Sequence, residues 1–353
     1  MNPATMPHPF TPIRSAPSRR VARLLCCGLW ATISLPACEA KSPPPVPAPA
    51  AAPQTADATA TAALTPPVKA LMDKTLKNLK FVEGGSFQMG DFGPLHSPDK
   101  LPYSPATNNK PAHMVSVDSF SMSAYKTTYA DHDVYSAATG KALAGMDRIS
   151  RKTRYADAAA GLKWQQARDY CMWLGGLLQL PMDLPTEAQW EYAARNRGQM
   201  LLYATDNGKM EDGRNVWGSS QIEDYLAKHQ LDSPWPSLPL GQFPPTPLGL
   251  HDMVTDGFEW MLDWYGSGYY ATSAEKNPAG PPTGQEKVLR SFSNQAGNGL
   301  APGDGFSFAR HHRHPDPPKV NPVTFKPDPD VNMTRDTAAR CVVNSAKPVP
   351  SRR

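Results

Sequence analysis

The sequence predicts one exported domain of mixed strands and helices, with much irregular structure, behind a membrane-targeting leader. Three observations predict it. Short segments alternate apolar and polar residues as strands do, and two later segments repeat apolar residues at helical spacing. Proline occupies 39 of the 353 positions, and proline interrupts regular elements. The residues from Leu71 onward are numerous enough to bury a sizeable core as one domain.

The leader, residues 1–37, resembles a bacterial lipoprotein signal peptide. Basic residues precede an apolar stretch, roughly residues 24–35, that is shorter than the ~20 residues of a bilayer span. Leu35-Pro36-Ala37-Cys38 resembles a lipobox, whose Cys is lipidated. We expect Cys38 to anchor the chain in a lipid bilayer, facing the periplasm, and Glu39 favours the outer membrane over the inner. An ordinary cleaved signal with a chance Cys is the alternative, and Sec or twin-arginine export stays open.

Export also changes the charge balance. The chain has 36 Lys and Arg against 32 Asp and Glu, and the leader holds four Arg and no acid, which leaves 32 against 32. This balance does not favour a nucleic-acid partner. Residues 38–75 are rich in Pro, Ala and Thr, a composition that predicts a tether without a core. Residues 76–346 remain as the folded domain.

Four segments of that domain carry clear periodicity. Residues 81–90 alternate around a Gly-Gly pair and predict a short hairpin, and residues 113–120 predict a strand. Residues 162–178 place apolar side chains on one helical face. Thr186 and Gln189 fit a capping box that opens a second helix, with Glu187 in its first turn.

An ordered series of motifs resembles the sulfatase-modifying factor family, typified by the formylglycine-generating enzymes. The motifs include F-V-E-G-G-S-F-Q-M-G at 81–90, A-R-D-Y-C-M-W-L at 167–174, L-P-T-E-A-Q-W-E-Y-A-A-R at 184–195, F-E-W-M-L-D-W-Y at 258–265 and A-A-R-C at 338–341. The resemblance covers residues 79–343. It implies a single α+β domain, formylglycine-generating-enzyme-like and related to the C-type-lectin fold.

The resemblance implies two structural calcium sites built from carboxylates and carbonyls, the oxygen ligands that calcium prefers. The ligands of the first are the side chains of Asp252 and Glu259 with the carbonyls of Thr255 and Gly257. The ligands of the second are at Asn215, Val216, Asp232 and Pro234. Acids that cap turns and face solvent are the alternative. The resemblance also implies a disulfide between Cys171 and Cys341, against which two buried thiols remain possible.

The family oxidises a substrate cysteine with two active-site cysteines that bind copper(I), a metal suited to soft thiolates. Ungapped counting places Ala296 and Ala301 at those two positions, and the sequence has no cysteine between Cys171 and Cys341. We therefore expect no copper. The family's R-G-G-S element is also altered, to R-S-F-S at 290–293.

Other ligand chemistry is concentrated near residue 311. The candidate ligand-binding residues are Phe258, Arg290, Arg310, His311, His312 and His314. Histidines bind iron, copper or zinc, but neighbours in an extended H-H-R-H run point to opposite faces. We therefore do not expect iron there, and an exposed basic loop is the simpler interpretation.

Two functional hypotheses follow. In the first, the chain is a membrane-anchored, non-catalytic binding or accessory protein that holds an envelope protein or a small ligand. In the second, it is a metal-dependent oxidoreductase of the family, acting on a protein cysteine or a small molecule. No catalytic residue is assigned, because the catalytic cysteines are absent.

Overall fold

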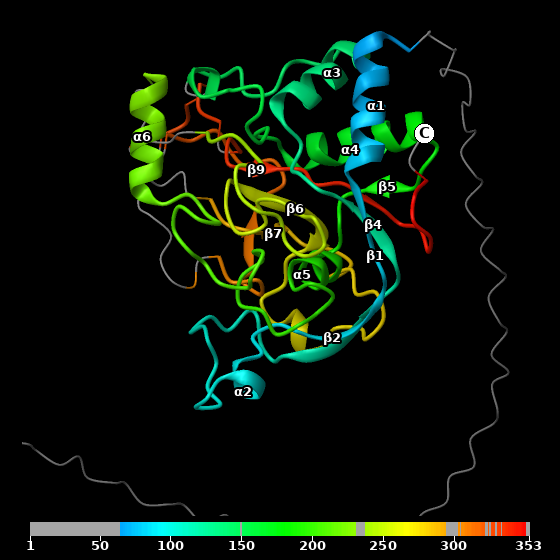
Figure 1. Cartoon of the computed structure of the whole chain (residues 1–353), viewed down its shortest axis with the longest axis vertical. Coiled ribbons are helices and arrows are strands. Elements are labelled where there is room, and N and C mark those ends of the chain that lie inside the picture. The colour runs from blue at the N-terminus through cyan, green and yellow to red at the C-terminus, as the bar shows by residue number, and fades with distance from the viewer. Residues whose placement is uncertain are drawn as a thin grey trace, which may run out of the picture. The chain divides into compact units, whose positions relative to one another are not determined.

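The structure is a computed structural model that describes residues 64–350, except 149, 231–236, 294–302, 304, 322–323, 325, 329 and 333. Cys38, the signal peptide and most of the tether therefore lie outside the described residues. The described chain belongs to one folded unit of short helices and strands joined by long irregular segments. Figure 1 shows α1, α3 and α4 at one end of this unit and β2 and α2 at the other. The α+β, single-domain prediction is confirmed.

The first helix, α1 (Pro66–Asn78), lies in a segment that the sequence assigned to the tether. Two prolines open it, at positions where a helix loses no hydrogen bond. Val68, Leu71 and Met72 are buried on its inner side. The Pro-rich composition of residues 38–75 hid this short amphipathic segment, so folded chain begins earlier than the predicted residue 76.

The predicted hairpin at 81–90 is wrong, because its two halves do not pair with each other. β1 (Leu79–Val82) pairs with β4 (Phe120–Ser123), and β2 (Gly85–Met89) pairs with β3 (His113–Val117). The Gly-Gly pair is a crossing point between two sheets. A Cβ on Gly84 would lie 2.4 Å from the Val117 carbonyl oxygen, so only glycine permits this approach. The predicted strand at 113–120 is divided at the same crossing.

The two predicted helices are present. α4 (Trp164–Leu178) buries Ala167, Tyr170, Cys171 and Leu174 on one face. α5 (Glu187–Ala194) starts with the predicted capping box, in which Thr186 Oγ1 accepts from the Gln189 amide and the Gln189 side chain accepts from the Thr186 amide. Further helices are α2 (Gly93–His96), α3 (Tyr129–Thr139) and α6 (Ser219–His229), with short 3-10 turns at Ser150–Lys152 and Tyr269–Ala271.

Two four-stranded sheets organise the core. One has the order β1-β4-β10-β5, with β5 at Met182–Asp183 and β10 at Val342–Val343. The other has the order β8-β7-β6-β9, with β6 at Phe258–Trp264, β7 at Lys287–Arg290, β8 at His311–Arg313 and β9 at Thr337–Ala338.

Two apolar clusters lie on the two sides of the β6–β7 pair. Met261 and Val288 belong to the cluster that contains Trp190, whereas Trp260 and Leu289 belong to the cluster that contains Cys171. This division follows from the period-two alternation of a strand. In the described part of the chain, no helix is long and apolar enough to cross a bilayer.

Candidate functional site

Arg290 is the last residue of β7, and Arg310 directly precedes β8. Both arginines belong to one buried network of charged side chains. The Arg290 guanidinium is 3.0 Å from Glu187 Oε1 and 3.0 Å from Glu191 Oε2. Arg310 binds the Glu187 carboxylate with two nitrogens, at 2.7 and 2.9 Å. Burial raises the pKa of Glu187, but the charges of Arg310 and Arg290 outweigh it, and the net pKa lies below its usual value. Ligand contact by either arginine stays a prediction; in this structure Nη1 and Nη2 of Arg290 and all three nitrogens of the Arg310 guanidinium donate to internal acceptors.

The three histidines point in different directions. The His311 ring lies 4.9 Å from the Phe258 ring, while the His312 ring stacks on Tyr265 at 3.9 Å and its Nδ1 is 2.7 Å from Glu286. His314 Nδ1 contacts the Asp316 backbone at 2.6 Å. Within the described ranges, no three His, Cys, Asp or Glu side chains converge as metal ligands.

Phe258, Phe292 and His311 form a half-buried aromatic face, which we call the aromatic face below. The Phe258 and Phe292 rings are 5.8 Å apart and meet edge to face. Burial lowers the pKa of His311 to about 4, so its imidazole is neutral near pH 7. Aromatic rings of this kind bind apolar or aromatic groups, and the Arg313 guanidinium lies over the Phe258 ring, 5.7 Å from its centroid.

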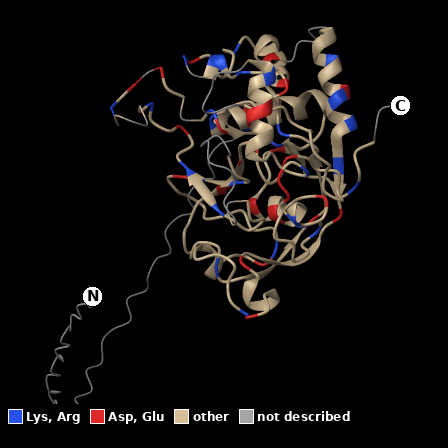
Figure 2. Ribbon diagram, turned by 60° about the vertical axis from the view of Figure 1, so that its left-hand side comes forward, with Lys and Arg blue, Asp and Glu red and all other residues tan. Residues whose placement is uncertain are grey.

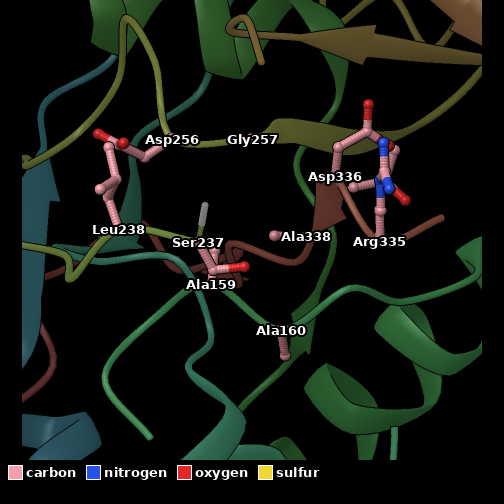
Figure 3. Close-up of a pocket in the computed structure, with 10 residues that line it drawn as sticks. Ala159, Ala160, Ser237, Leu238, Asp256, Gly257, Arg335, Asp336 and Ala338 are labelled. Atoms are coloured by element: carbon pink, nitrogen blue, oxygen red, sulfur yellow. The ribbon is translucent and has the colours of Figure 1, made fainter. Parts of the chain in front are cut away.

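A small pocket lies next to the aromatic face, and backbone hydrogen bonds connect residues of the pocket to residues of the face. The Gly257 amide donates to the Phe292 carbonyl at 3.2 Å, and the Phe258 amide donates to the Asp336 carbonyl at 2.8 Å. In Figure 3, Asp256 lies on one side of the pocket, Arg335 and Asp336 lie on the other, and alanines lie between them. The pocket is lined by Ala159, Ala160, Ser237, Leu238, Asp256, Gly257, Arg335, Asp336, Thr337 and Ala338. The recess has a volume of about 10 Å³, which is about the size of one water molecule, and the Asp336 carboxylate at its edge is paired with Arg313.

The first predicted calcium loop, residues 252–259, already faces a cation from the protein itself. The Lys126 ammonium donates to the carbonyls of Asp252 and Thr255 and lies 3.4 Å from Glu259 Oε1. Both oxygens of Glu259 also accept from Arg340, each at 2.9 Å. The Asp252 carboxylate accepts from the Gly241 amide at 2.9 Å. Calcium requires six to eight oxygens free to turn toward it, so these residues do not fit the ion.

The second predicted calcium site is described only in part. Asn215 Oδ1 accepts from the Glu211 amide at 2.8 Å, and Asn215 Nδ2 donates to the Lys209 backbone carbonyl at 3.0 Å. Asn215 and Val216 line one pocket together with Asp252 and Thr255. Asp232 and Pro234 lie outside the described residues, so calcium at this site stays a prediction.

The predicted disulfide is confirmed. Cys171 and Cys341 are bonded, with their Cα atoms 5.5 Å apart, and both are buried. The bond joins α4 to the residue before β10. Ala296 and Ala301, the positions counted for the copper ligands, lie outside the described residues.

Sequence reasoning missed several buried charged residues near the site. Lys126, Glu191 and Arg340 are each at most 1% exposed. Lys126 stands between a strand and a helix, where a lysine normally faces solvent, and its sequence gives no sign of burial. Arg340 could have been suspected, because it adjoins Cys341 in a motif that was recognised.

Comparison with known proteins agrees with the fold. The profile of the sulfatase-modifying factor enzyme 1-like domain matches residues 67–325. The formylglycine-generating enzyme of Mus musculus is 26% identical over 258 residues, covering 60% of this chain and 64% of that enzyme. The Bos taurus enzyme is 32% identical over 135 residues, covering 37% and 33%. The inactive C-alpha-formylglycine-generating enzyme 2 of Bos taurus is 31% identical over 105 residues, covering 30% and 32%.

The chain therefore spans between 32% and 64% of the length of these curated relatives. Among solved structures, PvdO from Pseudomonas aeruginosa superposes with a TM-score of 0.55 at 20% identity, covering 75% of this chain and 93% of that chain. Treponema denticola variable protein 1 gives 0.52 at 17% identity, covering 76% and 95%. These two likenesses concern the fold alone.

Proposed function

Because the chain belongs to the sulfatase-modifying factor enzyme 1-like family, we propose that it is a non-catalytic member that binds an envelope partner. In this proposal, acylated Cys38 anchors the protein in the outer membrane, and the domain works in the periplasm. The partner is an envelope protein or a small ligand held on the aromatic face and the adjoining pocket. Structural calcium is proposed only for the site at Asn215, Val216, Asp232 and Pro234.

One observation carries the non-catalytic assignment. Beyond Cys38, the sequence has two cysteines, and the structure joins them in a buried disulfide. A copper(I) oxidase needs free thiolates, because soft sulfur ligands stabilise that ion. No thiol of this domain is left to bind copper or to attack a substrate. A relative named as an inactive formylglycine-generating enzyme supports the idea that such domains persist without the activity.

The aromatic face is the best-supported binding surface. It combines half-buried rings with a neutral histidine, and the Arg313 guanidinium lies over one of the rings, that of Phe258. Apolar contact and a few polar contacts of fixed geometry are the usual elements of a specific ligand site. The oxidoreductase alternative receives no comparable support, because the three histidines diverge.

The catalytic half of the proposal is tested with the purified full-length protein. It is supplied with copper(I), oxygen and a peptide that carries a sulfatase-type cysteine, beside an active formylglycine-generating enzyme as positive control. We expect no aldehyde product by mass spectrometry. Formation of that aldehyde by the protein would overturn the non-catalytic assignment.

The binding half is tested by site-specific photo-crosslinking in cells. A photoreactive phenylalanine analogue replaces Phe258, and a matched variant carries it at Met172, which is 50% exposed on α4. We expect a discrete crosslinked species from position 258 and none from position 172. Equal crosslinking at both positions, or none at either, would contradict a partner on the aromatic face.

A further inference from the structure

The strongest unassigned feature of the molecule is a buried lysine inside the loop of residues 252–259. Lys126 is 1% exposed, and its ammonium lies among oxygens of three residues. It donates to the Thr255 carbonyl at 2.6 Å and to the Asp252 carbonyl, and it is 3.4 Å from Glu259 Oε1. Two of these groups, the Thr255 carbonyl and the Glu259 carboxylate, were expected to bind calcium.

We propose that the Lys126 ammonium replaces calcium in this loop and acts as a covalently attached structural cation. An ammonium has three donors and no acceptor, which matches three surrounding oxygens. Because the ammonium is covalently attached to the chain, the loop keeps its cation at any calcium concentration. This inference goes beyond the proposed function and does not depend on it.

A calcium ion and this ammonium exclude each other. Calcium lies about 2.3–2.6 Å from its oxygen ligands. A calcium ion at this distance from the Thr255 carbonyl and the Glu259 carboxylate would compete with Lys126 Nζ for the same oxygens, and the two positive charges would repel each other. The remaining charges near Lys126 are Arg340, Asp252 and Asp256. Arg340 fills the other side of Glu259, donating from Nε and Nη2 at 2.9 Å each, and Trp190 Nε1 donates to the same carboxylate at 2.8 Å.

The loop requires a cation because of its backbone. Asp252 and Asp256 have left-handed φ values of +57° and +66°, a region that residues other than glycine adopt rarely, although Asp adopts it more readily than most. These conformations accompany carbonyls that turn inward, and inward carbonyls need a buried donor or a metal. The same loop supplies Asp256 and Gly257 to the pocket and leads into Phe258. Lys126 thus holds one wall of the proposed binding surface in place without added metal.

The test compares calcium binding and melting temperature in the full-length protein. Every variant carries Asp232→Ala, which removes a predicted ligand of the other calcium site. Lys126→Met keeps the length of the side chain and removes its charge. The matched control is Lys287→Met, because Lys287 is also buried and donates to a backbone carbonyl, that of Leu262, at 2.7 Å. Calcium binding is measured by calorimetry, and melting is recorded with calcium or with chelator.

We expect the chain with Lys126 to bind no calcium at this loop and to melt at the same temperature in calcium and chelator. Lys126→Met should melt roughly 10 °C lower in chelator, because two buried carbonyls lose their donor and Glu259 loses one of its two counter-charges. Any rise in melting temperature on addition of calcium should appear in Lys126→Met and not in Lys287→Met.

Two results would overturn the proposal. One is stoichiometric calcium binding, with a melting shift, by the chain that retains Lys126. The other is a Lys126→Met variant as stable in chelator as its parent. If Lys126→Met fails to fold, the measurement on the parent chain still decides between ammonium and calcium. Peptide oxidation plays no part in these readouts, so they fail or succeed independently of the proposed function.

Discussion

At the scale of single residues, some buried titratable groups contact a side chain of opposite charge and others do not. Glu187, Glu191 and Glu259 each face arginine at hydrogen-bond distance. His132 does not have such compensation. It is 1% exposed, packs against the rings of Tyr135 and Tyr170, and has a long contact of 3.4 Å from Nδ1 to the Ser136 hydroxyl. Burial lowers the pKa of His132 to about 4; the charge of Asp133 opposes this shift, and the charges of Arg154 and Lys141 add to it.

His132 should therefore make the fold sensitive to mild acid. The folded imidazole stays neutral down to about pH 4, whereas the unfolded one takes a proton near pH 6.5. The unfolded state thus binds more protons between these values, and the free energy of unfolding falls as pH falls from about 6.5 to about 4. The loss amounts to about 3 kcal/mol at most. Denaturant unfolding of His132→Phe should give a pH slope smaller by up to ~1.4 kcal/mol per pH unit in this window.

The control for this slope is His96→Gln, which changes a histidine that is exposed in the structure. Its pH slope should match that of the wild type. If His132→Phe and wild type lose stability at the same rate between pH 6.5 and 4.5, His132 is not the acid-sensitive group.

At the scale of elements, sequence reasoning succeeded where the determinants are local. The capping box at Thr186 and the apolar face of α4 depend on neighbours within one or two turns, and both appear as predicted. The hairpin at 81–90 failed because strand pairing is decided by distant chain: Val82 pairs with Phe120, and Gly85 pairs with Val117. The inward Lys126 was equally invisible, because nothing within a few residues of it indicates that the loop at 252–259 folds over it.

The Cys171–Cys341 disulfide links two elements of the fold and should have a measurable effect on the free energy of unfolding. It closes a loop across a separation of 170 residues and ties α4 to β10. On the chain-entropy estimate, closure of a loop this long stabilises the fold by about 5 kcal/mol. Denaturant unfolding of the Cys171→Ala/Cys341→Ala double variant should show a loss approaching that value, with a similar far-ultraviolet circular dichroism spectrum before unfolding.

Thiol titration provides the check on that bond. Denatured protein beginning at Leu64 should have no titratable thiol before reduction and two afterwards. Two thiols without reduction would contradict the disulfide and would also reopen the question of a copper site.

At the scale of the whole molecule, the order of motifs identified the domain correctly, because ordered matches over most of a chain are hard to obtain by chance. Charge was also informative. Figure 2 shows acidic and basic residues interspersed through the described domain, in keeping with the balance of 32 against 32 after the leader. The ligand of the site was not predictable, since the aromatic face is assembled from β6, β8 and the residue pair that follows β7.

Membrane attachment is a whole-molecule prediction that depends on Cys38. Cys38→Ala should abolish labelling by a radioactive fatty acid and move the protein from the membrane fraction to the soluble periplasmic fraction. A neighbouring substitution, Ser42→Ala, serves as control and should be labelled like the wild type. Equal labelling of Cys38→Ala and wild type would show that the chain is not acylated at this residue.

The position of β6 and β7 between the two apolar clusters bears on how the domain denatures. Adjacent residues such as Trp260 and Met261 belong to different clusters, so each cluster uses the same two strands as one of its walls. If one cluster opened, the strands would lose half of their packing and the other cluster would be exposed to water. We therefore expect a species with one intact half to be high in free energy and the two halves to melt together as one cooperative unit.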